Sequence, residues 1–79
     1  TIGHDVKTNN FVTICPGVNL SGCCKIGEGV EIGTGTKIIQ GKSIGENSII
    51  GAGAVVVDTI PSFVTAVGIP AKVIKEIKQ

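Results

Sequence analysis

The sequence predicts an all-β fold, a parallel solenoid built from six-residue repeats. Aliphatic residues recur with a period of six, and residues that favour turns recur at the same period. The apolar side chains are mostly Ile, Val and Ala, with two Phe and no Trp, Tyr or Met to fill a broad core. β-branched side chains are stiff and pack well on pleated strands. The composition therefore suits many thin layers of short strands.

The repeats run from position 2 to position 57 without an insertion. The aliphatic grid consists of Ile2, Ile14, Leu20, Ile26, Ile32, Ile38, Ile44, Ile50 and Val56, and Thr8 is its exception. Residues two apart on a strand share a face, so the small or β-branched residue that usually stands two positions before each grid residue also points inward. Three positions after the grid comes the turn column: Asp5, Phe11, Gly17, Cys23, Gly29, Gly35, Gly41, Asn47 and Gly53. Gly, Asn and Asp dominate this column and tolerate left-handed backbone better than most residues, so each repeat is one short strand followed by a tight corner.

Other folds fit the period poorly. The many glycines would destabilise a helix, and a spacing of six does not keep residues on one helical face. Antiparallel hairpins would need longer alternating strands and paired two-residue turns. A coil of short strands that stacks in parallel remains, and its stability comes mostly from neighbouring coils.

The tail after Val57 leaves the grid. Pro70 can occupy the first turn of a helix, and Val73, Ile74 and Ile77 share a face at helical spacings. We therefore expect a β-helix of about three coils over residues 1–57, and an extension over 58–79 that ends in a short capping helix. Because Thr1 already lies inside the repeat, we also expect an N-terminal domain upstream of it.

The charges are balanced, with seven Lys or Arg against six Asp or Glu, so no basic stripe predicts binding to nucleic acid. Apolar runs are short, which predicts neither a membrane span nor a signal peptide. Three Cys without zinc-ligand spacing indicate reduced thiols in a cytoplasmic protein. Cys24 falls at an inward position, and we assign no chemical role to Cys15 or Cys23.

The repeat of an aliphatic residue, often Gly, two variable residues, a small residue and one more variable residue resembles the hexapeptide repeat of left-handed parallel β-helix acyltransferases. In that family three hexads complete one triangular coil, so residues eighteen apart stack. The resemblance implies acetyl transfer from acetyl-CoA to a hydroxyl or amine of a sugar or sugar nucleotide, without a metal. It also implies a homotrimer with a groove between subunits, and the outward apolar residues Ile39, Ile49, Val55 and Val57 would suit such contacts.

The catalytic candidates lie near the start of the chain. His4 is the single His, its pKa range suits a general base, and it stands two residues after a grid position, on an outward corner. Gly22 lies eighteen residues later, and its lack of a side chain would admit a thioester. His4-Asp5 with Gly22 resembles the active-site pattern of the sialic acid O-acetyltransferase and amino-sugar N-acetyltransferase type. That resemblance implies His4 as base, Asp5 as its orienting group, and the Gly22 N–H facing the acetyl carbonyl. Relatives often carry a second His where this chain has Thr13, whose hydroxyl can still donate a hydrogen bond.

Candidates for the coenzyme groove lie late in the chain, where small residues would admit the pantetheine arm. They are Gly51, Ala52 and Gly53 in the last repeats and Gly68, Ala71 and Lys72 in the tail. The run from Gly68 to Lys72 resembles the exit motif of many hexapeptide acetyltransferases, where it borders the coenzyme, and Lys72 can pair with a phosphate.

Three other functions are alternatives to acetyl transfer. A non-catalytic solenoid that only trimerises is the main alternative. Carbonic anhydrases of this fold need three His around zinc, whereas this chain has one. Ice binding would need regular outward Thr. The acceptor's identity and the choice between O- and N-acylation stay open.

Overall fold

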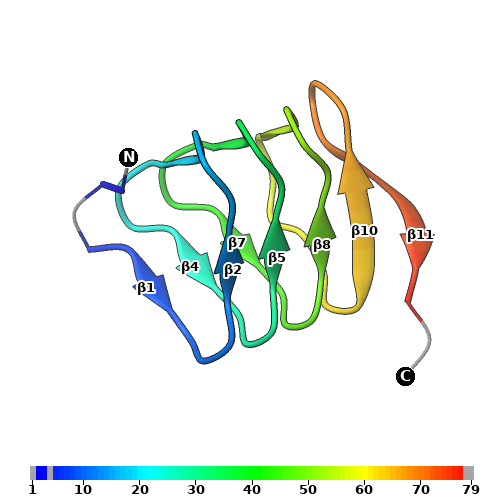
Figure 1. Cartoon of the computed structure of the whole chain (residues 1–79), viewed down its shortest axis with the longest axis horizontal. Coiled ribbons are helices and arrows are strands. Elements are labelled where there is room, and N and C mark those ends of the chain that lie inside the picture. Colours follow the sequence, from blue (N-terminus) through cyan, green and yellow to red (C-terminus); the bar gives the residue numbers. More distant parts are fainter. Residues whose placement is uncertain (1, 4, 78–79) are drawn as a thin grey trace.

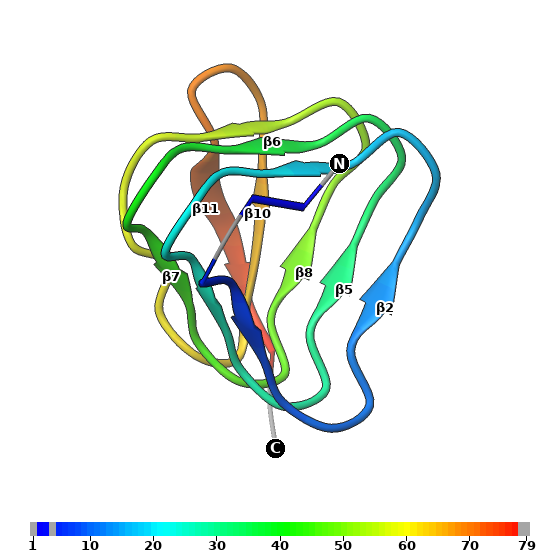
Figure 2. The same cartoon turned by 90° about the vertical axis from the view of Figure 1, so that its left-hand side faces the viewer.

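The structure, a computed structural model, describes residues 2–3 and 5–77, which wind into a triangular prism of stacked coils. Each full turn of the chain supplies three short strands and three corners, and the next turn lies directly on it (Figure 1). Viewed from the end of the prism, the coils superpose as triangles (Figure 2). The described residues form strands, turns and bends and no helix, so the predicted all-β parallel solenoid is confirmed.

Three sheets form the faces of the prism. Sheet A contains β3 (Asn19–Leu20), β6 (Lys37–Ile38) and β9 (Val55–Val56). Sheet B contains β1 (Lys7–Thr8), β4 (Lys25–Ile26) and β7 (Ser43–Ile44). Sheet C contains β2 (Thr13–Ile14), β5 (Glu31–Ile32), β8 (Ile49–Ile50), β10 (Val64–Val67) and β11 (Lys72–Glu76). Strands from β1 to β10 pair in parallel, with partners such as Leu20 and Ile38 eighteen residues apart.

The three corners are columns of turns. The first corner comprises Asp5, 22–23 and 40–41; the second comprises 10–11, 28–29, 46–47 and 62–63; the third comprises 16–17, 34–35, 52–53 and 68–71. Every residue of the predicted turn column has positive φ, between 56° and 76°, including the non-glycine residues Asp5, Phe11, Cys23 and Asn47. The period of six therefore reports backbone conformation as well as burial.

The core is a stack of thin layers. Inward residues on the three sheets are almost fully buried: Leu20, Ile38 and Val56; Ile26, Ile44 and Ile60; Ile32, Ile50 and Ala66. Ile2 and Ile14 of the first coil are 64% and 37% exposed, because no described coil lies beneath them. The rung-by-rung burial matches the thin-layer composition of the sequence.

The hydrogen-bonded coils continue past Val57, where the sequence grid stops. Ile60 bridges Ile44, and Ala66 pairs with Ile50, so partners are here sixteen residues apart. Two residues are missing from the first corner of this coil, in the stretch from Val56 to Ile60. The inward column therefore resumes with its phase shifted by two, and β10 becomes the next rung of sheet C.

The expected C-terminal helix is wrong, because Lys72–Glu76 forms strand β11. This strand pairs antiparallel with β10, with Val64 opposite Glu76 and Val67 opposite Lys72. Isolated helices of one or two turns are unstable in water, whereas pairing satisfies the edge of β10. The expected role of covering a strand edge is thus performed by a hairpin strand, which follows the turn at 68–71.

Buried hydroxyls tie successive coils together across the corners. The Thr36 hydroxyl donates to the Gly51 carbonyl at 3.1 Å, and the Ser48 hydroxyl donates to the Pro61 carbonyl at 2.6 Å. Ser48 Oγ also accepts a hydrogen bond from the Val64 backbone N–H at 3.3 Å. Ser48 therefore provides a hydrogen-bond partner for both a backbone carbonyl and a backbone N–H of the last coil, which is two residues shorter than the others.

Replacing Ser48 with Ala should lower the free energy of unfolding by about 2–3 kcal/mol, because a backbone N–H and a carbonyl lose their partner. The matched change Thr36→Val removes one bond to a carbonyl and should cost about 1 kcal/mol. Denaturant unfolding of both variants measures the difference. Equal losses would show that the two hydroxyls contribute alike and that the shortened coil has no special dependence on Ser48.

Candidate active site

The first corner carries two residues of the predicted site, Asp5 and Gly22. Ile2 bridges Leu20, and the Gly3 N–H donates to the Leu20 carbonyl at 2.6 Å, so the start of the chain lies under the segment around Gly22. A Cβ added to Gly3 would lie 2.5 Å from the Gly22 nitrogen. By the same offset Asp5 stacks beneath Cys23. His4 lies outside the described residues, and the structure places its sequence neighbours Gly3 and Asp5 at the corner that carries Gly22.

The corner holds Gly22 from above as well. The Gly41 N–H of the next coil donates to the Gly22 carbonyl at 3.0 Å. Asp5 is exposed, with its backbone in the left-handed region at φ 58°. An exposed carboxylate beside a bare backbone segment is an arrangement that can orient a basic side chain and admit an acyl group.

The third corner gathers the predicted coenzyme residues at its upper end. The Gly51 N–H donates to the Ala66 carbonyl at 2.9 Å, and the Gly53 N–H donates to the Thr34 carbonyl at 2.8 Å. Val55 connects this corner to the tail, because its N–H donates to the Gly68 carbonyl at 3.0 Å and its carbonyl accepts from the Ala71 N–H at 2.7 Å.

The remaining coenzyme candidates lie at the same end. Ala52 is exposed beside Gly53, and Lys72 begins the exposed strand β11. The structure thus brings all six late residues to one end of one corner.

Within one chain the two groups of site residues stay apart. The first and third corners border sheet A on opposite sides, since each sheet A strand runs from a third-corner turn to a first-corner turn. Thr13 lies on neither corner: it is exposed on β2 of sheet C, in register with Glu31. A single chain therefore does not bring Thr13, Gly22 and Gly51 to one point.

Sheet A has an apolar outer side between the two corners. Ile39 is 39% exposed, and Val55 and Val57 are half-buried. Lys37 shares this face, but its ammonium folds back to the third corner, where it donates to the Gly17 and Gly35 carbonyls at 3.1 and 3.3 Å. The centre of sheet A consequently keeps its apolar character.

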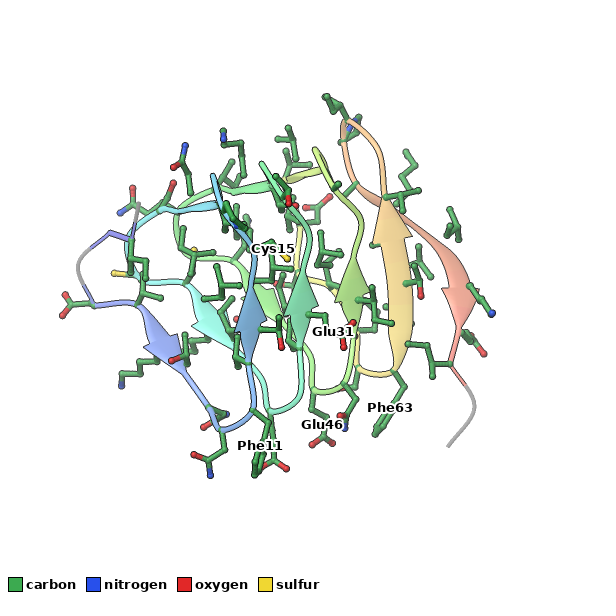
Figure 3. The ribbon with its side chains drawn as sticks, viewed as in Figure 1. Phe11, Cys15, Glu31, Glu46 and Phe63 are labelled. Carbon is green, nitrogen blue, oxygen red and sulfur yellow. The ribbon has the colours of Figure 1, made fainter. Side chains whose placement is uncertain are left out.

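A groove of about 510 Å³ runs along the outer side of sheet B, and the sequence reasoning did not identify it. Its side chains come from four successive coils: Lys7, Asn9, Lys25, Ser43, Glu46, Thr59, Pro61 and Ser62. Figure 3 shows Glu46 on the same edge of the prism as Phe11 and Phe63, which marks the second corner as one border of the groove. A signal for the groove was present in the sequence. Lys7, Lys25 and Ser43 each stand one position before a grid position and lie eighteen residues apart, which places them in one outward column.

The three cysteines lie in different environments. Cys24 is buried as predicted and its thiol donates to the Ile39 carbonyl at 3.3 Å. All three thiols are free, with Cys23 exposed on the first corner.

The described part of the chain contains no group of three or more His, Cys, Asp or Glu placed to hold a metal ion. It also contains no helix long and apolar enough to cross a membrane.

Comparison with known proteins identifies the repeat. The bacterial transferase hexapeptide family (six repeats) matches residues 23–58. A serine acetyltransferase from Buchnera aphidicola subsp. Schizaphis graminum is 41% identical over 86 residues, an alignment that covers 98% of this chain and 33% of the relative.

Two solved structures extend the comparison. The acetyltransferase domain of PglB from Neisseria gonorrhoeae, in complex with acetyl coenzyme A, has a TM-score of 0.89 and 45% identity over 90% of this chain and 35% of its own. A variant of perosamine N-acetyltransferase from Caulobacter crescentus, in complex with CoA and GDP-perosamine, has a TM-score of 0.89 and 36% identity over 91% of this chain and 34% of its own.

These matches confirm the resemblance to hexapeptide-repeat acyltransferases and the left-handed parallel β-helix that it implies. The chain is a hexapeptide-repeat β-helix with the fold of acetyltransferases whose structures contain CoA or acetyl-CoA. It spans about a third of the length of these relatives.

Proposed function

We propose that this chain forms the catalytic β-helix of an acetyltransferase that moves an acetyl group from acetyl-CoA to a hydroxyl or amine of a sugar or sugar nucleotide. Serine acetyltransferases and sugar acetyltransferases both occur among the relatives, which supports acetyl transfer in general. The His4-Asp5 pattern supports a sugar acceptor in particular.

The proposed step uses the first corner. His4 takes the proton of the acceptor hydroxyl or amine as this atom attacks the acetyl carbonyl carbon. The Gly22 N–H stabilises the negative charge that develops on the carbonyl oxygen, and Asp5 orients the imidazole. The carbon–sulfur bond then breaks, and the proton passes from His4 to the departing CoA thiolate. Each group acts at the corner where the structure stacks Asp5 beneath Cys23 and Gly3 against Gly22.

One arrangement supports the proposal further: Asp5 and Gly22 border one side of sheet A, and the late coenzyme candidates border the other. A three-fold assembly with sheet A turned toward the axis places the first corner of one subunit beside the third corner of the next. Gly51, Ala52, Gly53, Gly68, Ala71 and Lys72 of that neighbour then line the coenzyme groove.

The same assembly buries the apolar outer side of sheet A around Ile39, Val55 and Val57 between subunits. Thr13 lies on sheet C, outside this interface, so its coenzyme contact stays a prediction. A homotrimer with its active sites between subunits therefore combines the first-corner residues of one subunit with the late coenzyme candidates of the next.

Changing His4 to Ala should reduce kcat for acetyl transfer by about 10²–10⁴-fold, because a general base contributes a factor of this size. Size-exclusion chromatography with light scattering should find the same assembly as in the unchanged protein. Activity within a few-fold of the unchanged protein would remove His4 from the mechanism. If the unchanged protein itself transfers no acetyl group, the alternative of a non-catalytic trimerising solenoid is favoured.

Changing Ile39 to Lys should break the assembly, because a charge on sheet A would be buried between subunits. Ile49→Lys is the matched control, since Ile49 is exposed to 37% and lies on sheet C, whereas Ile39 is exposed to 39%. Light scattering should report monomers for Ile39→Lys and the original assembly for Ile49→Lys. The reverse result would place sheet C, and not sheet A, at the axis.

A further inference from the structure

Two glycines, Gly27 and Gly45, line the groove on sheet B. A Cβ on Gly27 would lie 2.7 Å from the Glu46 nitrogen, and a Cβ on Gly45 would collide with the backbone at Pro61 and Ser62. Stacking of the next coil therefore requires glycine at both positions. The consequence is a strip of bare backbone between the outward column of sheet B and the second corner.

The lower half of this groove is positively charged. Lys7 and Lys25 pair in register on adjacent strands, so their side chains leave the sheet about 4.8 Å apart. Like charges directly opposite one another repel, and an anion between them relieves the repulsion. Glu46, on the second-corner border, is the acidic side chain among the groove residues and partly offsets the two ammonium groups.

The upper half offers neutral hydrogen-bonding groups. Ser43 stacks on Lys25, and Thr59 comes from the coil above. Ser62 lines the second-corner border. Hydroxyls of this kind donate to and accept from the hydroxyls of a sugar. Three inter-strand steps separate Lys7 from Thr59, which makes the groove about 14 Å long, far longer than a free amino acid.

The groove begins beside the proposed catalytic corner. Lys7 follows Asp5 by two residues on the same edge between the first corner and sheet B. In the proposed trimer sheet A faces the axis, so sheet B stays on the outside and open to a ligand.

We infer that the groove on sheet B binds the acceptor, and that this acceptor is a sugar carrying a phosphate or diphosphate group. The inference rests on the proposed function. Lys7 and Lys25 hold the phosphate, and Ser43, Thr59 and Ser62 bind the neutral part of the ligand. The groove thus selects a phosphorylated sugar over a free amino acid such as serine.

Binding of small probes tests the groove without any need for catalysis. Inorganic pyrophosphate, UDP-glucose and L-serine are titrated separately into the purified protein, and backbone amide shifts are followed by NMR. Pyrophosphate and UDP-glucose should shift amides in 25–27, 43–46 and 59–62, whereas L-serine should not. No saturable shift with either phosphate compound, or equal shifts with L-serine, would overturn the inference.

Charge variants identify the side chains responsible. Lys25→Gln should weaken pyrophosphate binding about tenfold, the value of one charge-assisted hydrogen bond. Glu46→Gln should strengthen it about threefold, because an exposed repulsive charge is removed. Lys75→Gln on β11, away from the groove, is the matched control and should leave binding unchanged. Equal losses for Lys25→Gln and Lys75→Gln would mean that only net charge matters and would refute the site.

Coenzyme binding separates this inference from the proposed function. Calorimetry should give the same CoA affinity for the unchanged protein and for Lys25→Gln. A parallel loss of CoA affinity would assign the groove to the coenzyme phosphates and overturn the acceptor site. If the unchanged protein does not bind CoA, the proposed function fails, while the pyrophosphate and serine titrations still decide what the groove binds.

Discussion

The backbone hydrogen bonds between successive coils are the interaction on which the rest of this structure depends. They run from one rung to the next at nearly constant length, as in Lys7 N–H to Cys24 C=O and Thr13 N–H to Val30 C=O, both 2.9 Å. Because the partners on most parallel strands lie eighteen residues apart, residues at the same phase of successive rungs stack in columns. A slip of one residue would turn the buried columns toward solvent, so the aliphatic grid fixes the register.

Residues that are distant in the chain become columns on the surface through the same constraint. The column at the first corner carries Asp5 and Gly22, the column at the third corner carries the late coenzyme candidates, and the column on sheet B carries the groove. A prism with three corners cannot bring two of its corners together, so chemistry that needs both must use a second copy. The apolar side of sheet A, which lies between those two corners, is where such a copy has most to bury.

The sequence was sufficient for the solenoid because one period determines burial, turn geometry and stacking together. The positive φ at Asp5, Cys23 and Asn47 shows how far this holds even without glycine. The prediction stopped at Val57 because the first corner then loses two residues, which hides Ile60 and Ala66 from a strict grid. The helix predicted for the tail was wrong. The spacing of Val73, Ile74 and Ile77 fits a helix, but the segment instead pairs with the open edge of β10, which supplies backbone hydrogen bonds from a neighbouring strand.

The site was predictable only in part, for a related reason. The offset of eighteen places Asp5 at the corner that carries Gly22, and the late candidates lie together at the third corner, whereas Thr13 lies on neither. Their distribution over two corners follows from the phase of each residue within the coil. The groove went unnoticed because its lysines, hydroxyls and glycines are unremarkable in sequence and meet only when four coils are stacked.

Stacking of the next coil explains some of the glycines better than others. A Cβ on Gly33 would meet the Ala52 backbone at 2.6 Å, so the next coil alone demands glycine there. A Cβ on Gly51 would instead meet Cγ1 of the Val67 side chain at 2.6 Å, an atom that a rotamer change can move. Stacking therefore constrains Gly51 less than Gly33, although both follow an inward Ile on sheet C. Gly51 leaves bare backbone at the third corner, next to the exposed Ala52 and Gly53. The proposed passage of a pantetheine arm there would explain a glycine that stacking alone does not demand.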